Sequence, residues 1–510
     1  MAILTPSFVT DLDAPLLRLG RRDVWTARDA FTGTLVLGGV GSGKTSGSGK
    51  YLATTMLSSG WGGLVLCAKP DEADRWRRYA RDCGREKSLI VFDGSGRWKF
   101  NFLKYAMAME MAAGGVGNVA AVLTTVLQAA SGNTAPPGAG SGDQFWQKAA
   151  KEAITHALAI LWAAFGTVTL EDMMRLLQSR PAQPKAITAE WKKASYMAAA
   201  LATAYERPMH AMPEADFWGS YRYLTEVLPN PDPRTTGNLI QTLSADLFPL
   251  MMGPMRELFG SGLNVCPEMT HEGAVIVMDL PVRGWAEAGV LGQGIMKYLW
   301  QRAAERRRVD KHTRPVFLFV DEAQLLLSPY DAEFQSTARS ARIATVYLSQ
   351  NLPAFYERVG GRNPQDVADA LLGHFQTKIF HSNTCHRTNQ WASDGIGKRL
   401  QMRRTWGENV GGGTSWGTQG GWSSQSSSGP GGGSNGGGNT GGWSDGGNIS
   451  EGRNAGVNEV IDYDVQPSRF TGLRPGGPEN AGIVDGIMVK GGTPWRGSGR
   501  NWLPIEFQQS

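Results

Sequence analysis

Short, unbroken apolar runs are spaced along two parts of the chain, and most of them are followed by a segment of helical character. Runs without polar alternation are typical of strands buried on both faces of a parallel sheet, and strands alternating with helices predict such a sheet. The runs occupy residues 34–37, 63–67, 88–93, 273–279, 315–320 and 344–350. The sequence therefore predicts an α/β domain built from two separate stretches of the chain.

A helical pattern separates these two stretches. Apolar positions recur with the 3.6-residue period over residues 116–127 and 146–161. Residues 169–172 (Thr-Leu-Glu-Asp) fit a capping box, and residues 238–248 fit a further helix. We therefore predict an all-helical block over residues 104–262 that interrupts the α/β domain, with a turn at residues 131–142.

A glycine-rich segment follows the first apolar run and fits the phosphate-binding loop pattern G-x-x-x-x-G-K-[ST]. Glycines let consecutive backbone N–H groups face the β- and γ-phosphates, because a Cβ would block the turn. We expect Lys44 to reach the phosphate oxygens and Thr45 to bind Mg²⁺, at the start of a helix. A glycine-rich turn can match by accident, but the strand before and the helix after favour ATP binding. The loop comprises Gly38, Gly39, Val40, Gly41, Ser42, Gly43, Lys44 and Thr45.

Two acids, Asp321 and Glu322, end the apolar run that begins at residue 315. In open α/β sheets, ligands bind at the carboxyl ends of the strands. We expect Asp321 to hold the Mg²⁺ shell and Glu322 to polarise the attacking water as general base. An acidic pair after a strand is often only a solvated loop, but the phosphate-binding loop gives it a partner. The sequence thus predicts an ATPase with ATP and Mg²⁺ as cofactors.

Further candidate site residues lie at both ends of the last apolar run, residues 344–350. Gln350 ends it and either contacts the γ-phosphate or the water, or only caps the next helix. Arg339 and Arg342 precede the run. They are either ordinary surface arginines or, in a ring of subunits, a source of transition-state stabilisation for a neighbour's site.

Composition narrows the class of protein. The chain has 510 residues, enough for two or three domains, and 41% hydrophobic residues, which excludes general disorder. The net charge of +5 does not by itself prove a nucleic-acid partner. Four scattered cysteines indicate neither a metal site nor a disulfide framework, and a reducing compartment fits. No signal peptide or membrane span is visible, so we expect a cytoplasmic protein.

Several short segments, in order and spacing, resemble the type IV secretion coupling proteins, the TraG/TraD-like ATPases of bacterial conjugation. They are residues 38–45, 67–72 (Cys-Ala-Lys-Pro-Asp-Glu), 101–103 (Asn-Phe-Leu), 143–146 (Asp-Gln-Phe-Trp), 321–323 (Asp-Glu-Ala) and 336–355. The resemblance implies a RecA-like motor domain with an inserted all-α domain. It also implies a homo-hexameric ring that hydrolyses ATP to pass a DNA–relaxase substrate to the secretion channel.

The resemblance also implies roles for individual residues. Lys44 and Thr45 would be the phosphate and Mg²⁺ residues, Asp321 and Glu322 the acidic pair, Gln350 the sensor and Arg339 the trans arginine. Cys67 stands where the family usually has an acid, and the usual N-terminal transmembrane helices are not seen. Membrane contact would then come only through partners, at the periphery of the inner membrane.

Residues 407–450 are rich in glycine and serine and predict a flexible loop. Tryptophans within or beside it would either stack on nucleobases or belong to an inert linker; they are Trp406, Trp416, Trp422 and Trp443. The predicted domains are a RecA-like part over 1–103, the helical insertion over 104–262, a second RecA-like part over 263–406, the loop, and a closing segment over 451–510.

DNA contact rests on two arginine-rich segments, residues 75–85 and 302–311, which suit either a DNA channel or a solvated helix face. Two alternatives to the coupling motor therefore stay open. One is a soluble hexameric DNA translocase unconnected with secretion. The other is an adaptor that docks protein substrates and uses ATP only for assembly.

Overall fold

The computed structural model describes residue 8 and residues 11–111, 115–130, 141–230, 233–359, 363–413 and 448–509. The chain divides into two compact units. One consists of residues 1–396 and 466–510, and the other of residues 397–465.

A nine-stranded sheet forms the centre of the first unit, with the strand order β13-β12-β9-β3-β8-β7-β4-β6-β5. The strands from β9 to β5 in this order run parallel, and β12 and β13 add antiparallel at one side. The bounds are β3 Thr34–Leu37, β4 Gly62–Leu66, β5 Leu89–Phe92, β6 Val275–Met278, β7 Val316–Val320, β8 Ile343–Ser349, β9 Thr377–Phe380, β12 Ile483–Lys490 and β13 Trp502–Gln508. All six predicted apolar runs are strands of this sheet.

Helices pack against the sheet because each carries an apolar face. Trp61 and Trp76 are buried in the core on one side, and Trp76 stacks on Phe317 with ring centroids 5.9 Å apart. Trp25 is also buried and donates its indole N–H to Thr377 Oγ1 at 3.2 Å. The helices of this part are α1 Ala27–Ala30, α2 Lys50–Ser58, α3 Glu72–Asp82, α13 Val282–Arg306, α14 Asp331–Thr337, α15 Leu352–Val359, α16 Pro364–Gly373, α17 His386–Ile396 and α18 Pro467–Thr471; a small hairpin, β1 Pro15–Arg18 and β2 Val24–Thr26, precedes them.

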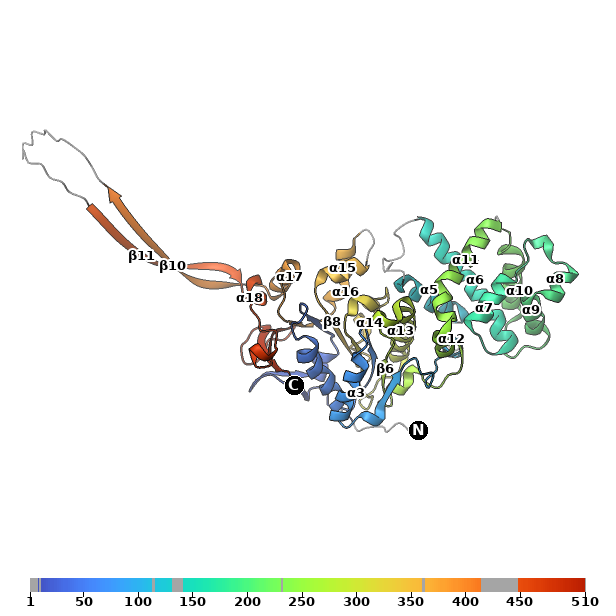
Figure 1. The fold of residues 1–510 in the computed structure, drawn as a ribbon, viewed down its shortest axis with the longest axis horizontal. Helices are drawn as coiled ribbons and strands as arrows, with labels where there is room; N and C mark the ends of the chain where they lie inside the picture. Colours follow the sequence, from blue (N-terminus) through green and yellow to red (C-terminus); the bar gives the residue numbers. More distant parts are fainter. Residues whose placement is uncertain are drawn as a thin grey trace, which may run out of the picture. The chain divides into compact units, whose positions relative to one another are not determined.

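A group of helices lies between β5 and β6 in the sequence. Helix α6 packs against α5, α7, α9 and α10, and α5 in turn packs against α13 of the sheet domain (Figure 1). Thr169 caps α7 by accepting the backbone N–H of Asp172, and its hydroxyl bonds the Asp172 carboxylate at 2.7 Å. The bounds are α4 Phe102–Met111, α5 Val116–Ala130, α6 Ser141–Phe165, α7 Leu170–Gln178, α8 Ala189–Ala194, α9 Tyr196–Glu206, α10 Glu214–Arg222, α11 Pro233–Met251 and α12 Gly253–Gly260. Most of the predicted turn, residues 131–140, lies outside the described residues.

The second unit is an antiparallel ribbon of two strands, β10 Lys398–Gly413 and β11 Asn448–Tyr463. Their pairing runs from Lys398 opposite Tyr463 to Gly413 opposite Asn448. The prediction of a loop over residues 407–450 is therefore wrong at both ends, because residues 407–413 and 448–450 are paired strand. Trp416, Trp422 and Trp443 lie outside the described residues.

Candidate functional site

The predicted site residues other than Arg339 follow neighbouring strands at one edge of the sheet. Strands β3, β8, β7 and β4 are consecutive and parallel, so their carboxyl ends meet at this edge. The register pairs Leu37 with Ser349, Val320 with Tyr347 and Leu66 with Val320. The glycine loop, Gln350, the acidic pair and the turn after β4 consequently converge.

The glycine loop has the open backbone that phosphate binding needs. Gly41 and Gly43 adopt positive φ angles of 73° and 79°, which residues with a side chain rarely do. A Cβ on Gly43 would lie 2.5 Å from Val484 Cγ2. Among the described residues, the N–H groups of Gly41, Gly43 and Lys44 donate to no backbone carbonyl. These donors have no hydrogen-bond partner within the described part of the chain, and they fit the oxygens of a phosphate group.

The chain after the loop enters helix α2 through a tight π turn, Thr45–Gly49, whose Gly47 has non-helical backbone angles. Helix α2 begins at Lys50, so the helix expected after the loop is present. Ser48 in this turn is buried and bonds the side chain of His381, which follows β9. The turn is thus attached to the next strand of the sheet as well as to its own helix.

His381 has one definite tautomer. Its Nδ1 lies 2.7 Å from the carbonyl oxygen of Asp485, which can only accept, so Nδ1 carries the proton. Its Nε2 then accepts the Ser48 hydroxyl at 2.7 Å. Complete burial lowers the pKa of His381 from 6.5 to about 4, and the nearby Lys44 charge acts in the same direction. The neutral ring therefore supports the turn at physiological pH.

We expect the His381→Asn variant to lose part of the wild-type sensitivity to acid. The pKa of His381 is lower in the folded chain than in the unfolded chain. At a pH between these two values, His381 therefore binds a proton in the unfolded chain but not in the folded one. The contribution of neutral His381 to the free energy of unfolding is fully present above the unfolded pKa. It is lost as the pH drops from 6.5 to about 4, which lowers the free energy of unfolding by about 3 kcal/mol. Urea unfolding between pH 4.5 and 7.5 measures the slope. The exposed His312→Asn variant should keep the wild-type slope, and a His381→Asn slope equal to it would contradict this assignment.

The phosphate-loop residues and the acidic pair lie in direct contact. Thr45 Oγ1 donates to Asp321 Oδ2 at 2.9 Å, and Lys44 Nζ lies 3.9 Å from Glu322 Oε1. All four side chains come from the ends of β3 and β7, although 276 residues separate Thr45 from Asp321. Burial lowers the pKa of Lys44, against the opposing charges of Glu322 and Asp321. The structure therefore brings the two predicted halves of the site together.

Glu322 is the most constrained residue of the site. Its backbone is left-handed, with φ 50° and ψ 49°, which is uncommon for a residue with a side chain. Its carboxylate accepts bonds from Lys69 Nζ at 2.9 Å, Gln324 Nε2 at 2.9 Å and Gln350 Nε2 at 3.2 Å. Burial opposes ionisation, but these bonds and the charges of Lys44 and Lys69 prevail and lower the pKa of Glu322 to about 2.

Gln350 lies within this contact network, and Arg339 lies away from it. Arg339 is exposed and precedes β8, whereas Gln350 follows it. The seven residues of β8 span about 23 Å, so Arg339 is at the opposite edge of the sheet from the site of its own chain. Arg342 donates to the carbonyl of Thr313 at the same far edge.

Sequence reasoning gave no role in the site to Lys69, in the turn between β4 and α3, or to Glu72, the first residue of α3. Lys69 contacts both acids, at 2.9 Å from Glu322 and 3.9 Å from Asp321. Glu72 is buried and accepts the N–H of Ala68 at 2.7 Å. Ligands bind at the carboxyl ends of parallel strands, and this rule, which placed Asp321 in the site, applies equally to the residues that follow β4. It could have identified Lys69 and Glu72.

The second oxygen of Glu72 has no partner among the described residues. Burial, followed by the charge of Asp321, raises the pKa of Glu72 from 4.5 to about 8. A cavity of about 10 Å³ lined by Glu72, Thr45 and Asp321 adjoins it, which is room for roughly one water molecule.

The oxygen ligands at this place fit Mg²⁺. Mg²⁺ prefers hard oxygen ligands, keeps several waters, and is usually held by one or two protein side chains together with phosphates. The Thr45 hydroxyl and the Asp321 carboxylate are such ligands and already touch each other. Within the described ranges, no three His, Cys, Asp or Glu side chains cluster as a separate metal site.

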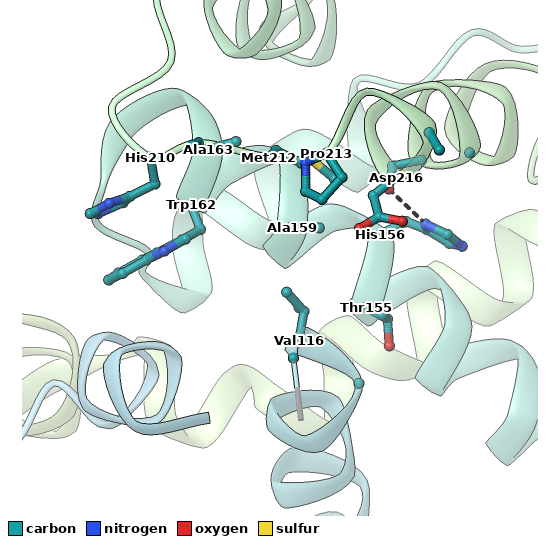
Figure 2. A pocket seen from close by; sticks show the side chains of 16 residues that line it. Val116, Thr155, His156, Ala159, Trp162, Ala163, His210, Met212, Pro213 and Asp216 are labelled. Atoms are coloured by element: carbon teal, nitrogen blue, oxygen red, sulfur yellow. Dashed lines mark hydrogen bonds between the residues drawn. The ribbon is translucent and has the colours of Figure 1, made fainter. Parts of the chain in front are cut away.

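A larger cavity lies within the helical group, apart from this site. Its volume is about 340 Å³, and its walls are mainly apolar. Figure 2 shows Val116 across from Met212 and Pro213, with Trp162 and His210 side by side at one end. The two rings stack with centroids 4.5 Å apart, and His156 Nδ1 lies 3.0 Å from Ser220 Oγ.

The helices of the described ranges differ from membrane-spanning helices in length and composition. None is by itself both long and apolar enough to cross a bilayer. One bent pair, Gln147–Phe165 with Leu170–Gln178, meets the length and composition test only when its two helices are counted together.

The fold and the loop define a RecA-like α/β protein with a phosphate-binding loop and a helical insertion, as predicted. Residues 315–430 match the family model described as the TraM recognition site of TraD and TraG. No curated protein matches the chain in sequence. The resemblance to type IV coupling proteins is thus confirmed by this model and by the solved structures below.

Those structures are of the bacterial conjugative coupling protein TrwB. Its unbound form, TrwBΔN70, aligns with a TM-score of 0.58 and 13% identity over 97% of this chain and 90% of that chain. TrwB with the non-hydrolysable ATP analogue ADPNP gives a TM-score of 0.55 at 13% identity, over 97% and 90% of the chains. TrwB with ADP and Mg²⁺ gives 0.56 at 13% identity and the same coverage.

Proposed function

We propose that this protein is an ATP-hydrolysing coupling motor that passes DNA, together with a relaxase or another protein, to a conjugation channel. The observation that carries the proposal is the convergence of Lys44, Thr45, Asp321, Glu322 and Gln350 at one sheet edge, in the fold of a conjugative coupling protein. TrwB has been solved with an ATP analogue and with ADP and Mg²⁺, which supports the same cofactors here.

Each residue has a distinct task in this proposal. Lys44 and the loop N–H groups bind the phosphates, and Thr45 and Asp321 hold Mg²⁺, which when bound neutralises phosphate charge. Glu322 orients the attacking water and takes up its proton at the carboxylate. Gln350 is hydrogen-bonded to Glu322 and follows β8 directly. It acts as the sensor that transmits a change at the site to β8 and to the helix that follows.

We propose that Arg339 acts in hydrolysis at the site of a neighbouring subunit in a ring. Strand β8, about 23 Å long, separates it from the site of its own chain, so direct contact with a phosphate bound there is not expected. We therefore propose a homo-hexamer in which this edge of one subunit faces the site of the next. The family model's TraM recognition region supports a relaxosome partner for the part of the chain it matches.

The decisive experiment measures ATP turnover with and without DNA. We expect DNA to raise turnover in the wild type, and we expect Lys44→Ala to abolish turnover in both conditions. Lys87→Ala, an exposed lysine before β5 at the opposite edge of the sheet, is the matched control and should behave as wild type. Turnover that DNA leaves unchanged would favour the adaptor, and an active Lys44→Ala protein would refute the catalytic assignment.

A further inference from the structure

Three donor groups hold both oxygens of the Glu322 carboxylate. Its Oε1 accepts from Lys69 at 2.9 Å and from Gln350 at 3.2 Å. Its Oε2 accepts from Gln324 at 2.9 Å and from Gln350 at 3.3 Å. Only 5% of the side chain is exposed. Glu322 must give up at least one of these contacts before its carboxylate can take a proton from the attacking water.

Of the groups that bond the Glu322 carboxylate, Lys69 can break its contact most readily. Its side chain is 27% exposed, whereas those of Asp321 and Glu322 are 4% and 5% exposed. The Lys69 side chain therefore reaches solvent, whereas the two acids are buried. Gln324, by contrast, is itself fixed by the hydroxyl of Ser349 at 2.8 Å.

The backbone beneath Lys69 is fixed although its side chain is accessible. The residue before it, Ala68, donates its N–H to the buried carboxylate of Glu72 at 2.7 Å, and Pro70 follows it. A fixed turn with a long, flexible side chain lets the ammonium group change partners without moving the strand.

A terminal phosphate would compete for this ammonium group. Lys44 Nζ lies 3.9 Å from Glu322 Oε1, and Lys69 contacts the same oxygen, so both cations occupy the space between the loop and the acids. The doubly charged terminal phosphate of a nucleoside triphosphate outweighs one carboxylate in attracting them. A nucleoside diphosphate lacks that group.

We propose that Lys69 is a positioning residue: it holds Glu322 in the nucleotide-free protein and turns to the terminal phosphate of a bound nucleoside triphosphate, which frees Glu322 for the attacking water. This inference rests on the proposed function, because it needs a triphosphate in the glycine loop. No covalent step is involved, since only hydrogen bonds and ion contacts are exchanged.

The first half of the inference is tested without nucleotide. Urea unfolding of Lys69→Met, Glu322→Gln and the double variant gives the coupling between the two side chains. We expect a coupling of at least about ten-fold in the unfolding equilibrium constant. Lys99 and Glu257, 2.6 Å apart but 29% and 60% exposed, form the control pair, with a coupling below about five-fold. A coupling for Lys69 and Glu322 no larger than the control would refute the holding contact.

The second half is tested by binding. We expect Lys69→Met to weaken a non-hydrolysable ATP analogue by about ten- to one-hundred-fold and to leave ADP affinity within about two-fold. Lys69→Arg, which keeps the charge, should retain most of the preference for the triphosphate and shows that the site still folds. Equal losses for both nucleotides, or none for either, would refute the phosphate contact. Wild-type protein that binds neither nucleotide would instead refute the proposed function and leave the coupling measured without nucleotide intact.

Discussion

Replacing Glu322 by glutamine is expected to lower the rate of ATP hydrolysis by about 10²- to 10⁴-fold while ATP remains bound. Glutamine keeps the size of the side chain but cannot take a proton from the attacking water. Lys44 and Thr45, which we assign to the phosphates and Mg²⁺, are unchanged in this variant. Single-turnover hydrolysis and equilibrium binding of ATP, measured on the same preparation, separate the two effects.

The surroundings of Glu322 can accommodate this change. The new amide would meet Gln324 Nε2 donor to donor, but Gln324 can stay in place and exchange the two ends of its amide, because the Ser349 hydroxyl that holds it both donates and accepts. Glu333→Gln, an exposed carboxylate on α14, is the matched control and should hydrolyse ATP at the wild-type rate. Glu322→Gln protein that hydrolyses ATP within about three-fold of wild type would exclude Glu322 as the general base.

The central strands could be predicted because burial on both faces leaves a simple signature. Strands β3 to β8 are nearly continuous apolar runs, and no other local pattern fits them. The side strands lack that signature. Strand β13 contains Pro504, which a strand tolerates at the border of a sheet where its missing N–H is not needed, and β12 contains Gly486. Their pairing depends on the sheet already present.

The ribbon of β10 and β11 was missed for a related reason. Residues 407–413 include four glycines, a composition that predicts a loop. The paired register from Lys398 to Gly413 comes from alignment with β11 across the chain, and no local propensity reveals it.

Motifs predicted the site residues that belong to a recognisable sequence segment. They did not predict the residues that reach the site only because two strands are neighbours in the sheet. Lys44, Thr45, Asp321 and Glu322 sit in recognisable segments, and the structure brings them together. Lys69 reaches Glu322 only because Leu66 is paired with Val320, and His381 reaches Ser48 only because β9 lies beside β3. Such contacts follow from register, which the sequence alone leaves open.

A buried ion pair stabilises the segment that follows the acidic pair. Lys297 of α13 donates to Asp331 Oδ2 at 2.6 Å and to the carbonyl of Leu326 at 2.6 Å, and the side chains of the pair are 2% and 1% exposed. Asp331 also accepts from Gln301 and from the N–H of Ser328. Burial lowers the pKa of Lys297, and the Asp331 charge opposes that shift. The pair thus links the segment after Glu322, from Leu326 to Asp331, to helix α13.

We expect Lys297→Met to lower the free energy of unfolding by about 3–5 kcal/mol, because it leaves the Asp331 carboxylate buried without a cation. Methionine fills nearly the same volume, so lost packing contributes little. Urea unfolding at pH 7 measures the change, and the exposed Lys99→Met should cost no more than about 1 kcal/mol. The double variant Lys297→Met with Asp331→Asn should recover part of the loss, since no buried charge then remains. A double variant as unstable as the sum of the two single ones would show that the charges are not coupled, and that packing and the Leu326 contact hold this segment in place.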